Sequence, residues 1–176
     1  MVTGARRIPP VPVFDVSQTE GEPLPALETA AAGAVGGLVP ALVAIAGDLD
    51  VTVELLSDAA WSHGQSKGVC RWPDDEEEPP RIEVNEGLPE ADLAVTLVHE
   101  YAHALLHGEG DKARGKREVE AEAVAYVVGR YLGLDVGGSA FYLAAWSEEA
   151  AAQVEERLGR ISTMAKTIIE AIDIDE

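Results

Sequence analysis

The chain has 176 residues, a length that corresponds to one domain with a hydrophobic core of its own. Hydrophobic residues make up 47% of the sequence, which excludes a largely disordered chain, and aromatic residues make up only 5%, which leaves the core to Ala, Val and Leu. The 13 basic residues are outnumbered by 32 acidic ones, and the resulting net charge of −19 argues against nucleic-acid binding through phosphate neutralisation.

The same composition predicts the surroundings of the protein. No stretch reaches the roughly 18 apolar residues of a membrane-spanning helix, and no apolar run follows Arg6 and Arg7 as it would in a signal peptide. The single Cys70 excludes an internal disulfide, so we expect a cytoplasmic protein without membrane contact. The acid excess suits molar intracellular salt, which screens the self-repulsion, and we expect a halophilic source.

The first 28 residues are expected to form an extended, Pro-rich N-terminal arm, in which the alternating residues 11–16 fit an edge strand. We expect residues 29–176 to form a single domain. Across this boundary, residues 26–47 are rich in Ala and predict a helix that is weakened by several glycines and kinked or restarted at Pro40.

Three short strands are expected next, and an acidic loop over residues 74–80 separates the last two. The strands cover residues 51–56, 68–72 and 81–84.

The second half of the chain is predicted to be helical. The first of its helices begins at Pro89, with the acidic Glu90 and Asp92 in its first turn, and a polar loop over residues 109–115 follows it. Gly133 ends the second helix. The expected helices cover residues 89–106, 116–132, 139–146 and 148–172. This order predicts an α+β fold in which a small sheet is covered by helices.

Residues 99–103 read His-Glu-Tyr-Ala-His, an H-E-x-x-H motif inside the helix expected over residues 89–106. His99 and His103 are four residues apart, so both imidazoles leave the same face of the helix, about 6 Å apart along its axis. Two such imidazoles can bind one Zn²⁺ at about 2.0–2.1 Å. Glu100 lies beside them, where its carboxylate can take a proton from a water molecule that the metal activates.

A catalytic zinc site takes three protein ligands, so the motif needs one more. The helix expected over residues 116–132 carries Glu118 and Glu122 on one face, which continues through apolar residues, and Glu120 on the other side. A carboxylate on an apolar face is costly unless it is paired or binds a metal. We therefore predict Glu118 as the third ligand and Glu122 as the acceptor for the free N–H of a ligating imidazole. The reversed assignment and full exposure of all three glutamates are the alternatives.

His107 follows one turn after His103 on the same face of the motif helix. It is a candidate for binding substrate or stabilising the oxyanion, and alternatively a helix-end histidine favoured by the helix dipole. His63 and Cys70 have no cluster of ligand-type residues near them in the sequence, and we expect ordinary structural roles for both. Tyr101 is expected to pack away from the metal.

Residues 96–107, Thr-Leu-Val-His-Glu-Tyr-Ala-His-Ala-Leu-Leu-His, resemble the ImmA/IrrE family of zinc metallopeptidases, and residues 117–128 resemble its glutamate-bearing helix. Residues 13–21 and 141–146 are similar to segments of the ArdC-like branch of this family, whose members are encoded largely on mobile elements. The resemblance covers residues 13 to about 172. It does not include the N-terminal domain that binds single-stranded DNA in many ArdC-like proteins.

The resemblance implies a compact zincin-like domain, with the motif on a central helix and one zinc ion held by His99, His103 and Glu118. It implies a metallopeptidase that cleaves a cytoplasmic protein, for which a transcriptional repressor is one family-level example. The alternative is a non-catalytic antirestriction or mobile-element accessory protein that binds a partner and keeps zinc for structure. Glu100 favours the enzyme, because a structural zinc site has four closed ligands and no use for this carboxylate. The substrate and the oligomeric state stay open.

Overall fold

The computed structural model describes residues 31–33, 36–73, 75, 78–107, 114–136 and 148–173, with side chains from residue 155 onward in the last helix. The expectations for residues 1–28 and 139–146 lie outside these residues. The elements of the described part are α1 (Leu38–Ala44), β1 (Thr52–Leu56), β2 (Gly68–Arg71), β3 (Arg81–Asn85), α2 (Glu90–Leu106), α3 (Arg114–Tyr131) and α5 (Glu148–Asp173). They form an α+β arrangement, which confirms the predicted fold class.

The three strands form one mixed sheet in the order β1-β3-β2. β1 runs parallel to β3, with Thr52 opposite Arg81, and β2 runs antiparallel to β3, with Gly68 opposite Val84. Ile82 and Val84 alternate along β3 and are fully buried, as expected for a strand with one face on the core. In this strand order β2 lies at an edge of the sheet.

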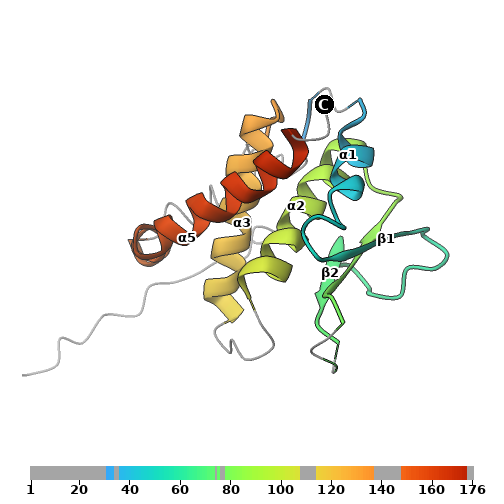
Figure 1. Ribbon diagram of the computed structural model, residues 1–176, viewed down its shortest axis with the longest axis horizontal. Helices are drawn as coiled ribbons and strands as arrows, with labels where there is room; N and C mark the ends of the chain where they lie inside the picture. Colours follow the sequence, from blue (N-terminus) through green and yellow to red (C-terminus); the bar gives the residue numbers. More distant parts are fainter. Residues whose placement is uncertain are drawn as a thin grey trace, which may run out of the picture.

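The motif helix α2 lies at the centre of the molecule, between the strands on one side and α3 and α5 on the other (Figure 1). It contacts α1, β2, β3, α3 and α5, which explains why most of its residues are buried. Tyr101 is fully buried, as expected, and its hydroxyl donates a hydrogen bond of 2.6 Å to the Leu42 carbonyl, which anchors α1 to α2. None of the helices in the described ranges is both long enough and apolar enough to cross a membrane.

The helix expected over residues 26–47 is wrong at residues 31–33 and 36–37, which are not helical, and α1 begins only at Leu38. Residues 26–30 and 34–35 of that expectation lie outside the described residues. Gly37 precedes it with φ of 83°, a left-handed conformation that glycine adopts without strain and that a helix cannot contain. Ala32 instead pairs with Asp135 in an isolated antiparallel bridge. Pro40 lies in the first turn of α1, where no backbone N–H is needed for an intrahelical bond.

The remaining boundaries differ by one or two residues from those expected. The predicted polar loop over residues 109–115 is too long, because α3 already begins at Arg114. Gly133, with φ of 81°, follows the end of α3 as expected for a C-terminal glycine. The long helix expected over residues 148–172 is confirmed as α5.

Candidate metal centre

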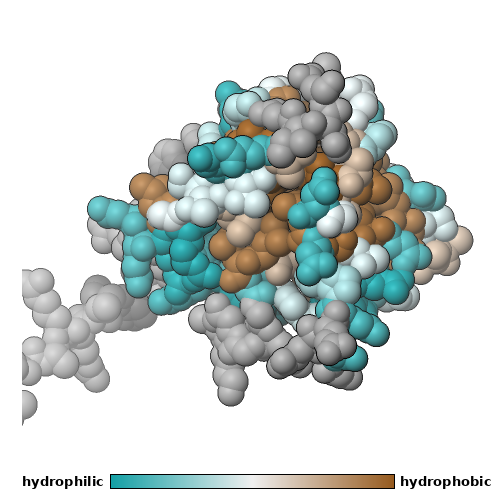
Figure 2. Space-filling view, in the orientation of Figure 1, coloured by the Kyte–Doolittle hydropathy of each residue, from teal (hydrophilic) through white to brown (hydrophobic). Residues whose placement is uncertain are grey.

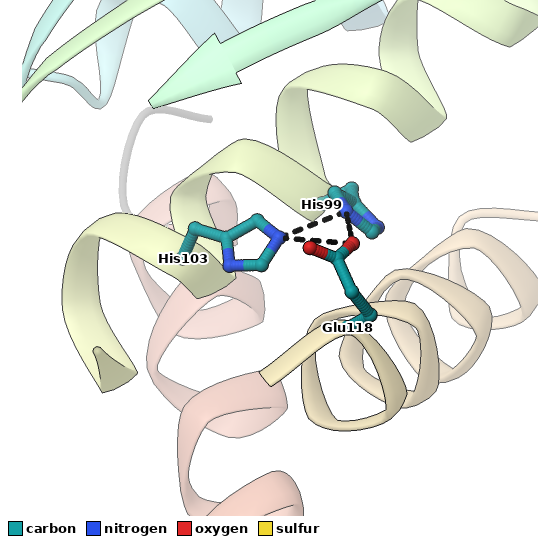
Figure 3. A group of neighbouring side chains, drawn as sticks. All are labelled: His99, His103 and Glu118. Carbon is teal, nitrogen blue, oxygen red and sulfur yellow. Dashed lines mark hydrogen bonds and ion pairs between the residues drawn. The ribbon is translucent and has the colours of Figure 1, made fainter. Parts of the chain in front are cut away.

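The two histidines of the motif lie one turn apart on α2 and turn the same ring atom toward each other. Their Nε2 atoms are 3.0 Å apart (Figure 3). His103 is buried and His99 is partly buried, because α3 covers this face of α2. Two imidazole nitrogens so close together suit a shared cation or a shared proton.

Glu118 reaches this pair from the first half of α3. Its Oε2 lies 3.7 Å from His99 Nε2 and 3.6 Å from His103 Nε2. Donors bound at 2.0–2.1 Å to a tetrahedral zinc ion are about 3.3 Å apart, so the three atoms have nearly the spacing of one zinc ligand set. The donor set of two imidazoles and one carboxylate, with its other side open to a cavity, therefore fits a catalytic metal.

Glu122 lies one turn further along α3 and contacts the other nitrogen of His99. The His99 Nδ1–H donates to Glu122 Oε2 over 3.1 Å, so the carboxylate fixes the ring with Nε2 toward His103 and Glu118. Glu118 and Glu122 thus share a face of α3, as the sequence predicts, and they contact different atoms of the same imidazole.

The carboxylates perturb the titration of the centre. Burial opposes the charged form of His99, but Glu118 and Glu122 outweigh it and raise the pKa of His99 from 6.5 to about 10. The neighbouring His103 and His99 in turn lower the pKa of Glu118 well below its ordinary value. In the metal-free protein His99 is therefore a cation at neutral pH, held where a metal cation would otherwise be.

Glu100 is buried beside the histidines and is held by the edge strand β2. The backbone N–H of Cys70 donates to its carboxylate, and Gly68 lies so close that a Cβ there would be 2.8 Å from Glu100 Cγ. Burial raises the pKa of Glu100 above 4.5, against the opposing effect of His99 and His103. A raised pKa brings a carboxylate closer to the range in which a general base works at neutral pH.

These side chains line one cavity of about 660 Å³ between α2, β2 and the beginning of α3. Consecutive residues of the edge strand, from Gly68 to Cys70, border it, so the cavity meets the strand along its edge. Three basic side chains stand on its wall beside the carboxylates: Lys67, Arg114 and Arg117.

His107 does not lie in this cavity. Its side chain is fully buried behind His103, with its Nδ1 3.1 Å from His103 Nδ1 and its Nε2 3.0 Å from Glu120 Oε2. The predicted contact of His107 with substrate or an oxyanion is therefore not supported, because protein atoms enclose the ring. The alternative that all three glutamates are exposed is also wrong, since Glu120 has no exposed surface. Its carboxylate forms ion pairs with Arg157 and Arg160 of α5.

Sequence reasoning missed Glu120 as a part of the centre. The pattern of apolar residues along α3 correctly places Glu120 on the side opposite Glu118. It does not indicate that Glu120 is buried there among His107, Arg157 and Arg160. A usable signal was the spacing of Arg157 and Arg160, one turn apart on an amphipathic helix.

His63 and Cys70 have structural surroundings, as expected. His63 bridges Glu83 over 2.7 Å and Arg71 over 3.1 Å, and its ring packs against Trp61. Burial, with a contribution from Glu100, raises the pKa of the Cys70 thiol to about 12, so it stays protonated and unreactive at neutral pH.

Comparison with known proteins finds one family model that matches the part of the chain carrying the candidate centre. Residues 48–129 match the family model of the IrrE N-terminal-like domain, Peptidase_M78. The match supports the ImmA/IrrE family. The ImmA/IrrE match includes every residue of the candidate centre and ends before α5. It does not reach residues 13–21, so the resemblance to the ArdC-like branch stays a prediction. No curated protein and no solved structure matches the chain.

The family is one of metallopeptidases, so the ImmA/IrrE match supports a metal-dependent hydrolase that acts on a protein. A possible metal-binding group of His99, His103 and Glu118 lies in the matched segment.

Proposed function

We propose that the protein is a zinc-dependent peptidase that hydrolyses peptide bonds of a protein substrate. His99, His103 and Glu118 bind the zinc ion, Glu122 orients His99, and Glu100 is the general base. The observation that carries the proposal is the convergence of both Nε2 atoms and the Glu118 carboxylate beside a cavity that Glu100 also lines. A structural zinc site would need a fourth ligand in place of the open cavity.

A zinc ion in this centre would supply a Lewis acid that polarises the scissile carbonyl and makes water more acidic. Glu100 takes a proton from the attacking water and passes it to the nitrogen of the leaving amine. The Cys70 N–H and the neighbouring Gly68 hold the Glu100 carboxylate in place for both transfers.

The edge strand β2 offers a binding site for the backbone of the substrate. It pairs with β3 on one side, and its residues 68–70 border the cavity beside the metal ligands. An extended peptide that pairs with a sheet edge gains backbone hydrogen bonds whatever its side chains, so such a site accepts a segment of an unfolded or loop region.

Metal content tests the ligand assignment. The wild-type protein is expected to contain about one zinc ion per chain, and Glu118→Ala should lose most of it because one of three protein ligands is gone. Glu122→Ala should keep the ion with an affinity about 10- to 100-fold weaker, since only the orientation of His99 is affected. Mass spectrometry of the purified proteins measures the content, and strong loss only in Glu122→Ala would reverse the two roles.

Glu100→Gln tests catalysis separately from metal binding. The variant should keep its zinc and its fold, and should cleave a mixture of fluorescence-quenched peptides at least about 100-fold more slowly, the usual share of general acid–base catalysis. Glu86→Gln, an exposed change of the same kind on the β3–α2 connection, is the matched control. Equal cleavage by the wild type and Glu100→Gln would remove Glu100 from the reaction.

The non-catalytic accessory role is the second candidate, and the same variant separates the two. A cellular effect that survives in Glu100→Gln with full zinc content would indicate partner binding. The net charge of −19 continues to argue against nucleic acid as that partner.

A further inference from the structure

We propose that His107 and Glu120 are positioning residues of the metal centre, which fix the tautomer of His103 so that its Nε2 carries a lone pair toward the cavity. The inference rests on the ligand assignment of the proposed function. It concerns a second layer of the centre that includes α5, a helix outside the segment that matches the family model.

The layer is a continuous chain of contacts behind His103. His103 Nδ1 lies 3.1 Å from His107 Nδ1, and His107 Nε2 lies 3.0 Å from Glu120 Oε2. The side chains of His107 and Glu120 both have no exposed surface. Water therefore cannot replace either contact, and each polar atom must be satisfied by its protein neighbours.

The direction of each hydrogen bond follows from Glu120. A carboxylate paired with arginines accepts hydrogen bonds, so His107 donates to it through Nε2–H. Because Arg157 and Arg160 already balance the charge of Glu120, a further charge on the fully buried ring of His107 would be costly, and its Nδ1 therefore acts as an acceptor. His103 must then donate its Nδ1–H to His107, which leaves Nε2 of His103 without a hydrogen. This Nε2 is the atom that lies 3.6 Å from Glu118 and 3.0 Å from His99 Nε2.

Two arginines from α5 lie against the Glu120 carboxylate and compensate its charge. Arg157 lies 3.0 Å from the same Oε2 that receives His107, and Arg160 lies 3.4 Å from Oε1. Arg160 also donates a hydrogen bond of 2.8 Å to the Leu106 carbonyl at the end of α2. A carboxylate without exposed surface is costly unless such partners compensate its charge, so α5 supplies what the hydrogen-bond chain requires.

Both candidate histidine ligands are thus supported by a carboxylate of α3. His99 contacts Glu122 directly, and His103 reaches Glu120 through His107. His99 and His103 lie on α2, and His107 is the residue that follows its last turn. Removal of a contact that only stabilises the core would lower stability and leave the zinc affinity of the folded protein unchanged, and this difference can be measured.

The tautomers are read from long-range ¹H–¹⁵N correlation spectra of the metal-free, ¹⁵N-labelled protein. The inference expects the hydrogen of His107 on Nε2 and that of His103 on Nδ1, with Nε2 of His103 unprotonated. A spectrum with the hydrogen of His103 on Nε2 would overturn it. This measurement needs neither bound metal nor activity, and it uses the wild-type chain, so no variant has to fold.

Zinc affinity, measured by competition with a chelating dye, gives the second test. His107→Leu removes both hydrogen bonds and should weaken binding about 10- to 100-fold, whereas His107→Gln can accept and donate through its amide and should recover most of the loss. Glu120→Gln replaces a group that only accepts by an amide that can also donate, and removes the charge that Arg157 and Arg160 balance, so it should also weaken zinc binding. Glu170→Gln, exposed on α5, should leave the affinity unchanged.

The two proposals fail in different ways. Absence of zinc binding by the wild type would overturn the proposed metal centre, and the tautomer spectrum would still decide the role of His107. Wild-type zinc affinity in a folded His107→Leu protein would overturn the positioning role and leave the metal centre intact.

Discussion

His99 lies among three carboxylates, those of Glu100, Glu118 and Glu122, and at the proposed metal site a cation would compete with the proton that they favour. With its pKa raised to about 10, the imidazole keeps a second proton over the whole neutral range. A metal ion that binds Nε2 must displace this proton, so metal binding and proton release are coupled. The carboxylates of the proposed metal site therefore also stabilise the protonated imidazole when no metal is bound.

An NMR titration of the metal-free protein tests this coupling. The ring of His99 should titrate near pH 10 instead of 6.5, and Glu122→Gln should lower that value because a raising carboxylate is removed. The sign for stability follows: protonated His99 stabilises the metal-free fold fully below pH 6.5, and this contribution is lost as the pH rises through 10. A midpoint near 6.5 in the folded protein would contradict the prediction.

The residues of the centre were predictable to the extent that spacing determines them. His99, Glu100 and His103 follow from one motif, and the pairing of Glu118 with Glu122 follows from the period of a helix. The helical period does not tell which of the glutamates are buried. Glu118 and Glu120 are only two residues apart on α3, yet the side chain of Glu118 is 48% exposed and that of Glu120 is 0% exposed. Only the position of α5 distinguishes them, and it depends on contacts far apart in the sequence.

At the scale of elements, β2 and α2 meet more closely than side chains would allow. A Cβ at Gly68 would be 2.8 Å from both Glu100 Cγ and Thr96 Cγ2, so the strand reaches the helix only because this residue has no side chain. The edge of the sheet is brought next to Glu100 in this way. The sequence predicts the strand but not the closeness of its approach.

Gly68→Ala should therefore impair catalysis more than it impairs folding. We expect the added methyl group to displace the Glu100 carboxylate and to reduce peptide cleavage about tenfold or more, with zinc content close to that of the wild type. Gly47→Ala, where the methyl group meets no atom within 4 Å, is the matched control. Unchanged cleavage by Gly68→Ala would show that Glu100 tolerates the shift.

Strands and long helices were predicted to within two residues, because their periodic patterns are strong. The exception is the segment before α1, where the composition favours helix and the backbone does not. Gly33 and Gly37 adopt positive φ there, and Ala32 pairs with Asp135, which follows the end of α3. Long-range pairing of this kind overrides a local preference for helix.

At the scale of the whole molecule, the net charge of −19 is carried by a small domain. Hydrophobic residues gather over the centre of the face in Figure 2, and hydrophilic residues lie around its rim. The excess of acidic over basic residues makes the surface charges repel one another over distances that water screens only in part. This repulsion is a property of the folded surface, and the centre itself contributes little because its carboxylates are paired.

Salt should consequently stabilise the fold. The melting temperature is expected to rise between 0.1 M and 3 M KCl, because the screening length falls from about 10 Å to below about 3 Å. The same salt step at pH 5, closer to the isoelectric point of about 4.4, should give a smaller rise, since fewer carboxylates are charged. A melting temperature that is unchanged or lower in 3 M KCl would count against the expectation of a halophilic source.

The bridge between Ala32 and Asp135 closes the described core, with backbone hydrogen bonds of 2.9 and 2.6 Å. More than half of the sequence separates these two residues, whereas His99 and Glu122 are only 23 positions apart. Closing a longer loop costs more chain entropy, so contacts of short separation form more readily during folding. The contact between His99 and Glu122 can therefore form early in folding, before the bridge closes the longer loop, so the side chains around His99 do not depend on the last long-range pairing of the chain.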